Sequence, residues 1–194
     1  MNSNWPLPKN DPWSTPFAES LLRHLEIGKG HHVLDIASGG GIPAFYLAEQ
    51  VGPEGSVLAV DIHQSQVLRA RSVQGNQLPW LRFEVGDMRF LPDNLPKVDR
   101  ITGNLSFMFF RPKRFEALQN LLRFLKPGGQ IVLTFPSLGT FDSLWNYVEK
   151  EMMVRSLNEE KNALKLAEKI EGIIREWVKP MQNIDSIKVV DVNG

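Results

Sequence analysis

The chain has 194 residues with 22 basic and 22 acidic side chains, so its formal net charge is zero. The length suits one domain with a sizeable core, and the neutral balance argues against nucleic acid or an anionic membrane as partner. The lack of cysteine excludes disulfides, thiolate metal sites and cysteine nucleophiles. No charged-then-apolar leader opens the sequence and no apolar run nears 18 residues, so we expect a cytoplasmic protein without a membrane span.

The amino-terminal segment is expected to be irregular. Residues 1–14 are rich in proline and asparagine, which break regular structure, and we expect them to form an arm. Trp5 and Trp13 in this arm either staple it to the body of the protein or help it to cover a substrate pocket. An amphipathic helix is predicted to begin at Pro16 and to end by Gly28.

The next stretch predicts a strand, a glycine turn and a helix. Residues 33–36 are typical of a short buried strand, and the three glycines at 39–41 indicate a sharp turn. Residues 42–49 predict a helix with Pro43 in its first turn. Such a turn lets a ligand approach the backbone closely, and the free N–H groups at the helix start attract an anionic group. This stretch therefore predicts a nucleotide-type site.

The rest of the chain alternates between strand and helix patterns, which is typical of a doubly wound, mostly parallel sheet in three layers. Further strands are predicted at residues 57–61, 82–88 with a Gly-Asp ending, 99–104 and 130–135, and helices at 64–74 and 112–125. Ligands of such sheets bind at the carboxyl ends of the strands. The polar residues predicted at these ends are Asp35, Asp61, Asp87 and Asn104.

Asp35 bears on the kind of nucleotide. Residues 39–44 also fit the dinucleotide pattern G-x-G-x-x-A, which is weak on its own. Asp35 lies where a dinucleotide would place its pyrophosphate, and two unit charges about 4 Å apart interact by roughly 4 kcal/mol at an effective dielectric near 20. The carboxylate would repel a pyrophosphate, but it would attract a ligand that carries an ammonium and a sulfonium.

The pattern D-x-A-x-G-x-G, formed by Asp35, Ala37, Gly39 and Gly41, closely resembles the first motif of class I S-adenosylmethionine-dependent methyltransferases. The resemblance continues in order through the later strands and covers roughly residues 15–140. It implies a Rossmann-like fold and a single S-adenosylmethionine-binding domain over residues 15–194. In that domain we expect the core in residues 30–136 and further helices and a strand in residues 137–194.

The resemblance also implies roles for individual residues. In the family the first acid and the glycine backbone hold the methionine end of the cofactor, the second acid takes the ribose hydroxyls, and the third accepts from the adenine amino group. Ile62 would form an apolar floor for adenine. The residues assigned in this way to S-adenosyl-L-methionine, and to its product S-adenosyl-L-homocysteine, are Asp35, Ala37, Gly39, Gly41, Asp61, Ile62, Asp87, Met88 and Asn104.

The predicted function is in-line methyl transfer to a small, apolar or carrier-bound acceptor, similar to the quinone- and carrier-lipid-modifying branch of the family. Such chemistry needs no metal and marks no catalytic residue in the sequence. The lack of cysteine excludes the thiol-based arsenic methylation of some relatives, and Asn104 is not followed by the Pro-Pro-aromatic motif of enzymes that methylate amino groups of nucleic acids. The alternatives are a nicotinamide-dependent oxidoreductase and a non-catalytic methyltransferase-like interaction module.

Two further segments leave alternatives open. Residues 107–110 (Phe-Met-Phe-Phe) either pack in the core or wall an apolar substrate pocket. After a helix predicted at 157–178, residues 184–192 are the only remaining strand pattern. The family usually adds two strands after the fifth, so we expect the carboxyl-terminal strand pair to be incomplete, through either a truncated or a reduced fold.

Overall fold

The structure is a computed structural model that describes residues 14–110 and 113–135. These residues belong to one compact unit. The predictions for Trp5 and Trp13 of the arm, for residues 137–194 and for the incomplete carboxyl-terminal strand pair lie outside the described residues.

The described part of the chain forms one sheet of five strands, all parallel to their neighbours. The strands are β1 (His32–Ile36), β2 (Ser56–Asp61), β3 (Leu81–Val85), β4 (Val98–Gly103) and β5 (Leu125–Leu133). Their order across the sheet is β3-β2-β1-β4-β5, so the order reverses between β1 and β4. This arrangement confirms the predicted doubly wound parallel sheet, and ligands of such sheets bind in the crevice at this reversal.

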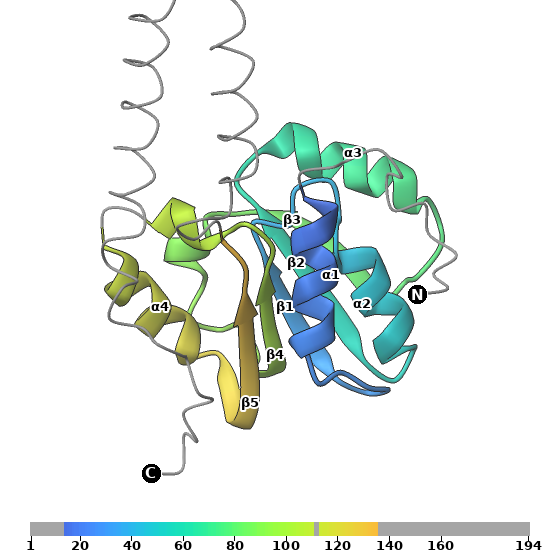
Figure 1. Ribbon diagram of the computed structural model, residues 1–194. Helices are drawn as coiled ribbons and strands as arrows, with labels where there is room; N and C mark the ends of the chain where they lie inside the picture. Colours follow the sequence, from blue (N-terminus) through green and yellow to red (C-terminus); the bar gives the residue numbers. More distant parts are fainter. Residues whose placement is uncertain (1–13, 111–112, 136–194) are drawn as a thin grey trace, which may run out of the picture. The chain divides into compact units, whose positions relative to one another are not determined.

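Helices cover both faces of the sheet. They are α1 (Thr15–His24), α2 (Ala44–Val51), α3 (Gln64–Gln74) and α4 (Arg114–Leu122), with short 3₁₀ turns η1 (Met88–Phe90) and η2 (Phe107–Phe110). Figure 1 shows α1, α2 and α3 on one side of the sheet and α4 on the other, as right-handed crossovers require. Within the described segments, no helix is both long and apolar enough to cross a membrane.

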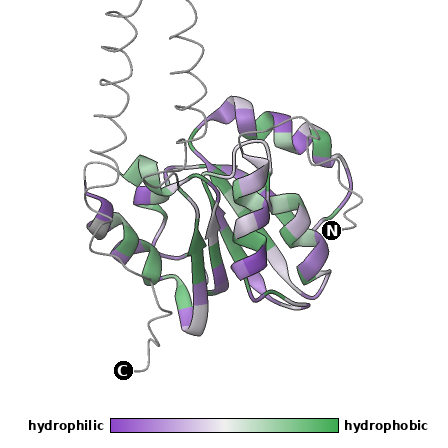
Figure 2. Ribbon diagram, in the orientation of Figure 1, coloured by the Kyte–Doolittle hydropathy of each residue, from purple (hydrophilic) through white to green (hydrophobic). Residues whose placement is uncertain are grey.

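The main hydrophobic core lies between the sheet and helices α1, α2 and α3. Buried strands read as nearly continuous apolar runs because both faces of a parallel sheet are covered. In β1, for example, every residue from Val33 to Ile36 is buried, Asp35 included. Figure 2 shows the central strands coloured mainly as apolar, whereas polar residues gather on the outer surfaces of α1 and α3.

Several element boundaries differ from the predicted ones. Helix α1 ends at His24 rather than near Gly28, because Leu25 already has an extended backbone. Pro43 precedes α2 instead of lying in its first turn. Strand β5 begins at Leu125 rather than Gln130, and the sheet register shifts where it passes through the Pro-Gly-Gly of residues 127–129.

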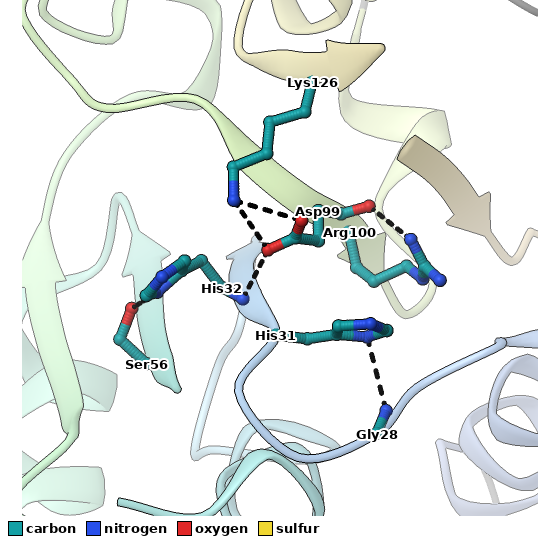
Figure 3. A network of polar contacts seen from close by, with 7 residues as sticks. All are labelled: Gly28, His31, His32, Ser56, Asp99, Arg100 and Lys126. Atoms are coloured by element: carbon teal, nitrogen blue, oxygen red, sulfur yellow. Dashed lines mark hydrogen bonds and ion pairs between the residues drawn. The ribbon is translucent and has the colours of Figure 1, made fainter. Parts of the chain in front are cut away.

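A polar network ties the amino ends of β1, β4 and β5, opposite the crevice (Figure 3). The Asp99 carboxylate accepts a hydrogen bond from the His32 backbone N–H at 2.8 Å and pairs with the Lys126 ammonium at 3.0 Å. Burial raises the pKa of Asp99, but the His32 bond, Lys126 and the nearby His31 outweigh it, so its pKa lies below the usual value. His31 and His32 therefore lie at this end of the sheet and are half-buried.

Gly41 shows how tightly α2 packs onto the sheet. Its φ is +99°, and an added Cβ would lie 2.5 Å from Cε2 of Phe45 and 3.1 Å from Cζ of Phe83. These two rings contact each other with centroids 5.3 Å apart, and both are buried. An added methyl group would have to displace at least one of these rings, and the positive φ favours glycine as well, so both the space and the backbone favour glycine at this position.

We predict that Gly41→Ala destabilises the protein by about 2–6 kcal/mol, because overpacking and a strained φ each cost about 1–3 kcal/mol. Gly40→Ala is the matched control, since its Cβ would meet only Gln66 Oε1 at 3.7 Å and its φ lies outside the left-handed region. Urea unfolding measures both variants. Equal midpoints for the two variants would show that the Phe45–Phe83 packing does not constrain Gly41.

Candidate functional site

A cavity of about 1010 Å³ opens at the carboxyl ends of β1, β2, β3 and β4. Its volume is at the upper end of the range of about 300–1,000 Å³ that is usual for small-molecule sites. The segments that follow the four strands line it, together with α3 and the start of α1. The cavity is therefore at the place where the strand order predicts a ligand site.

The glycine loop after β1 forms one wall of the cavity. Ala37 and Gly39 both have left-handed backbones, with φ of +50° and +52°. The loop is fixed by the Ser38 N–H, which donates to Val60 O at 3.1 Å, and by the Gly41 N–H, which donates to Ser38 O at 2.9 Å. Residues 37–40 line the cavity. Gly41 does not, so in this structure its role is packing against the aromatic pair below the loop.

Asp61, the last residue of β2, joins this loop to the next segment. Its side chain is buried and lines the cavity. One carboxylate oxygen accepts a hydrogen bond from the Gly39 N–H at 2.8 Å, and the other accepts from the His63 N–H at 2.8 Å. A carboxylate has about four lone-pair sites, so acceptor capacity remains for a ligand.

Asp35 is fully buried in β1 and does not line the cavity in this structure. Its Oδ1 accepts a hydrogen bond from the Thr102 hydroxyl at 2.7 Å, whereas Oδ2 has no hydrogen-bond partner among the described residues. Burial raises the pKa of Asp35 to about 7, the Thr102 bond opposes the rise, and the charge of Asp61 adds to it. A cation placed beside Oδ2 would stabilise the ionised form and lower this pKa.

Asp87 and Arg89 form a close ion pair at the far wall. The Asp87 carboxylate caps η1 by accepting from the Arg89 N–H at 2.9 Å, and it also pairs with the Arg89 guanidinium at 2.6 Å. The guanidinium bond lowers the pKa of Asp87, while burial opposes this shift and the backbone bond reinforces it. Met88 lies between the two charges in sequence, and all three residues line the cavity. Sequence reasoning missed Arg89, although a basic residue two positions after a predicted site acid is a visible signal.

Asn104 lies directly after β4 and is buried at the cavity wall. Its Nδ2 donates to the Ser14 backbone oxygen at 3.0 Å, and its Oδ1 accepts from the Thr134 hydroxyl at 2.7 Å. Ser14, at the start of α1, lines the cavity as well. The sequence carries no signal for this contact, which joins residues far apart in the chain.

Apolar side chains form the outer part of the cavity. Ile62, after β2, is 55% exposed and lines it, as does Phe109 at 60% exposed. The two alternatives for residues 107–110 both occur: Phe107 and Phe110 are buried with ring centroids 5.2 Å apart, whereas Met108 and Phe109 line the cavity. One helical turn thus serves both the core and the site.

Each sequence-predicted site residue except Asp35 and Gly41 thus lines one cavity. The cavity combines acids at two strand ends, Asp61 and Asp87, with a glycine loop that exposes backbone and an apolar wall. Within residues 14–110 and 113–135, no cluster of three or more histidine, aspartate or glutamate side chains could hold a metal ion.

The family model described as a methyltransferase domain matches residues 33–129, which is half of the chain. The chain is 34% identical to a ubiquinone/menaquinone biosynthesis C-methyltransferase of Idiomarina loihiensis over 55% of its length and 43% of the relative's. It is 32% identical to a tRNA (guanine(6)-N2)-methyltransferase of Thermus thermophilus over 60% of its length and 37% of the relative's. The chain thus spans less than half the length of these two relatives.

A solved structure described as an S-adenosylmethionine-dependent methyltransferase from Aquifex aeolicus has the same fold. It superposes with a TM-score of 0.53 at 27% identity, over 60% of this chain and 62% of that one. The fold, the glycine loop and the family match agree, and the chain belongs to the S-adenosylmethionine-dependent methyltransferase family.

Proposed function

We propose that this protein binds S-adenosylmethionine in the cavity and directs its methyl group to a small acceptor. The observation that carries the proposal is the Asp61 carboxylate, which faces the cavity at the end of β2 and holds the glycine loop by the Gly39 N–H at 2.8 Å. An acid at this point of an open α/β sheet is placed to accept from both hydroxyls of a ribose. The neighbouring loop of residues 37–40 lines the cavity and lets the same ligand approach its backbone closely.

The buried polar groups near the loop fit the amino-acid end of the cofactor. Asp35 Oδ2 and Ser38 Oγ are both buried without a hydrogen-bond partner among the described residues. An unpaired carboxylate oxygen suits an ammonium group, and an unpaired hydroxyl suits a carboxylate. The methionine end carries both groups, so the two orphaned atoms support its placement here.

The other walls fit the adenine ring. Ile62 and Met88, which directly follow Asp61 and Asp87 in the sequence, supply apolar surface to the cavity. The Asp87 carboxylate is already bonded to Arg89, which lowers its capacity to accept from an adenine amino group. We therefore assign adenine recognition to Asp87 together with Arg89, rather than to the acid alone.

When bound, S-adenosylmethionine supplies the methyl group and a thioether leaving group, with S-adenosylhomocysteine as product. The chain's contribution is to hold the acceptor in line with that group and to exclude water. Such positioning supplies up to about 7–11 kcal/mol of a barrier. The apolar residues Met108 and Phe109 line the cavity and are the candidates for this task.

For the acceptor we propose a small, apolar or carrier-bound molecule. The support is the apolar wall of Leu105, Met108 and Phe109 and the similarity to the quinone-pathway relative. The tRNA-modifying relative is similar to a comparable degree. The zero net charge of this chain favours the small molecule over tRNA, since phosphate contacts dominate nucleic-acid affinity.

Calorimetry with S-adenosylhomocysteine and with NADH tests the proposal. We expect S-adenosylhomocysteine to bind and NADH to give no heat of binding, because the acids at the strand ends repel a pyrophosphate. The same titrations separate the alternatives: binding of NADH alone would support an oxidoreductase, and binding of neither would support a non-catalytic module.

Removal of the Asp61 carboxylate should weaken cofactor binding. A hydrogen bond to a charged group contributes about 1.5–3 kcal/mol, so we expect Asp61→Ala to lose roughly ten- to a hundredfold in affinity for S-adenosylhomocysteine. The control is Asp93→Ala, which removes an exposed carboxylate paired with Arg123 outside the cavity. An Asp61→Ala protein that binds as tightly as the control would contradict the ribose assignment.

The buried acid predicts a pH dependence. With a pKa of about 7 in the free protein, Asp35 is largely protonated at pH 6 and must lose its proton to pair with the ligand's ammonium. Affinity for S-adenosylhomocysteine should therefore be about tenfold weaker at pH 6 than at pH 8. Calorimetry in buffers of different ionisation enthalpy should show proton release at pH 6.

Asp35→Asn is the matched control for this effect, since it has the same shape and no charge to titrate. We expect its affinity to be lower at pH 8 and nearly constant between pH 6 and pH 8. An equal pH dependence in the variant and the wild-type protein would show that another group is responsible.

A further inference from the structure

A chain of hydrogen bonds joins three segments that are distant in sequence. The Leu105 N–H donates to Thr134 Oγ1 at 2.9 Å, the Thr134 hydroxyl donates to Asn104 Oδ1 at 2.7 Å, and Asn104 Nδ2 donates to Ser14 O at 3.0 Å. The Thr134 N–H also donates to Gly103 O at 3.0 Å. The chain thus connects the segment after β5, the segment after β4 and the start of α1.

The direction of this chain follows from its two ends. The Leu105 N–H can only donate, and the Ser14 carbonyl can only accept. Ser14 therefore faces the NH₂ of the Asn104 amide, which leaves the amide oxygen facing Thr134. The Thr134 hydroxyl donates its single proton to that oxygen, and a lone pair of the same hydroxyl accepts the hydrogen bond from the Leu105 N–H. One side chain thus determines which way the Asn104 amide points.

Thr134 also forms a hydrogen bond to Leu105, a residue whose backbone has an unfavourable conformation. Leu105 has φ of +53°, a conformation that a leucine rarely adopts. Its side chain is buried and lines the cavity. The hydrogen bond from the Leu105 N–H to Thr134 is the described contact that anchors this strained residue beside the site.

Thr134 does not line the cavity, whereas the three residues connected to it, Ser14, Asn104 and Leu105, all do. We propose that Thr134 is a positioning residue for the cofactor site: it orients the Asn104 amide, keeps Leu105 in place and through Asn104 docks the start of α1 at the cavity wall. This inference rests on the proposed function, because the site it shapes is the one assigned to S-adenosylmethionine.

The test is calorimetry with S-adenosylhomocysteine. Thr134→Val removes both hydrogen bonds of the hydroxyl at nearly constant shape, and we expect affinity to fall about five- to tenfold. Thr134→Ser keeps the hydroxyl and should bind within about twofold of the wild-type protein. Thr15→Val is the matched control, since the Thr15 hydroxyl is buried without a partner among the described residues and lies outside the cavity lining.

A double variant distinguishes positioning from a general loss of stability. If Thr134 acts largely through Asn104, Thr134→Val should weaken binding less in an Asn104→Ala background than in the wild-type protein, because only the bond to Leu105 is then left to lose. If the double variant loses affinity by the product of the two single-variant factors, the inference is overturned. Wild-type affinity of Thr134→Val would also overturn it, and so would a Thr134→Ser protein that binds as weakly as Thr134→Val.

A second variant covers the case in which Thr134→Val does not fold. Asn104→Asp keeps the acceptor for Thr134 but loses the donor to Ser14, so we expect weaker binding; wild-type affinity would overturn the inference.

The titration of the wild-type protein distinguishes failure of the proposed function from failure of this inference. If the wild-type protein does not bind S-adenosylhomocysteine, the proposed function fails and the inference fails with it, whereas wild-type binding that the variants do not change overturns only the inference.

Discussion

The hydrogen bond from the Gly39 N–H to the Asp61 carboxylate is the constraint on which the site depends. It fastens the turn after β1 to the end of β2, where both line the cavity. The second oxygen of the same carboxylate receives the His63 N–H just before α3 and fixes the neighbouring segment too. A ribose bound at Asp61 would therefore meet a carboxylate already held in place, and little conformational entropy would be lost on binding.

Asp35 differs from Asp61, because part of its hydrogen-bonding capacity is unused. Its buried Oδ2 has no partner in the described part of the chain, and the resulting desolvation is why its pKa rises to about 7. Only Thr102, its register partner on β4, lessens that cost. A bound ammonium would offset the free-energy cost of burying the Asp35 carboxylate. The low dielectric constant of the surroundings would strengthen the attraction between the two charges. On the proposed placement of the ligand, protonation of Asp35 would be coupled to occupancy of the site, while Asp61 lines the cavity directly.

The sequence predicted what depends on local pattern. The alternation of apolar strands with helices was enough for the parallel sheet, and the glycines with Asp61 and Asp87 marked the edge where the cavity lies. It did not predict what depends on register and packing. The Asp35–Thr102 pair exists because β1 lies beside β4 in one particular register, and Gly41 is needed for the Phe45–Phe83 contact, which a motif cannot distinguish from a ligand contact.

The walls of the cavity also differ in how many hydrogen bonds hold their side chains. On one side, the loop, Asp61 and the ion pair of Asp87 with Arg89 are held by several short hydrogen bonds each, which suits a ligand of constant shape. On the other side, Met108 and Phe109 project from a single 3₁₀ turn whose fixed part is the buried pair Phe107 and Phe110. Substitutions at Met108 and Phe109 would alter the wall and leave the buried pair in place. On the proposed function, a change of acceptor would be accommodated at η2, whereas the wall formed by the glycine loop, Asp61 and the Asp87–Arg89 pair would allow less variation.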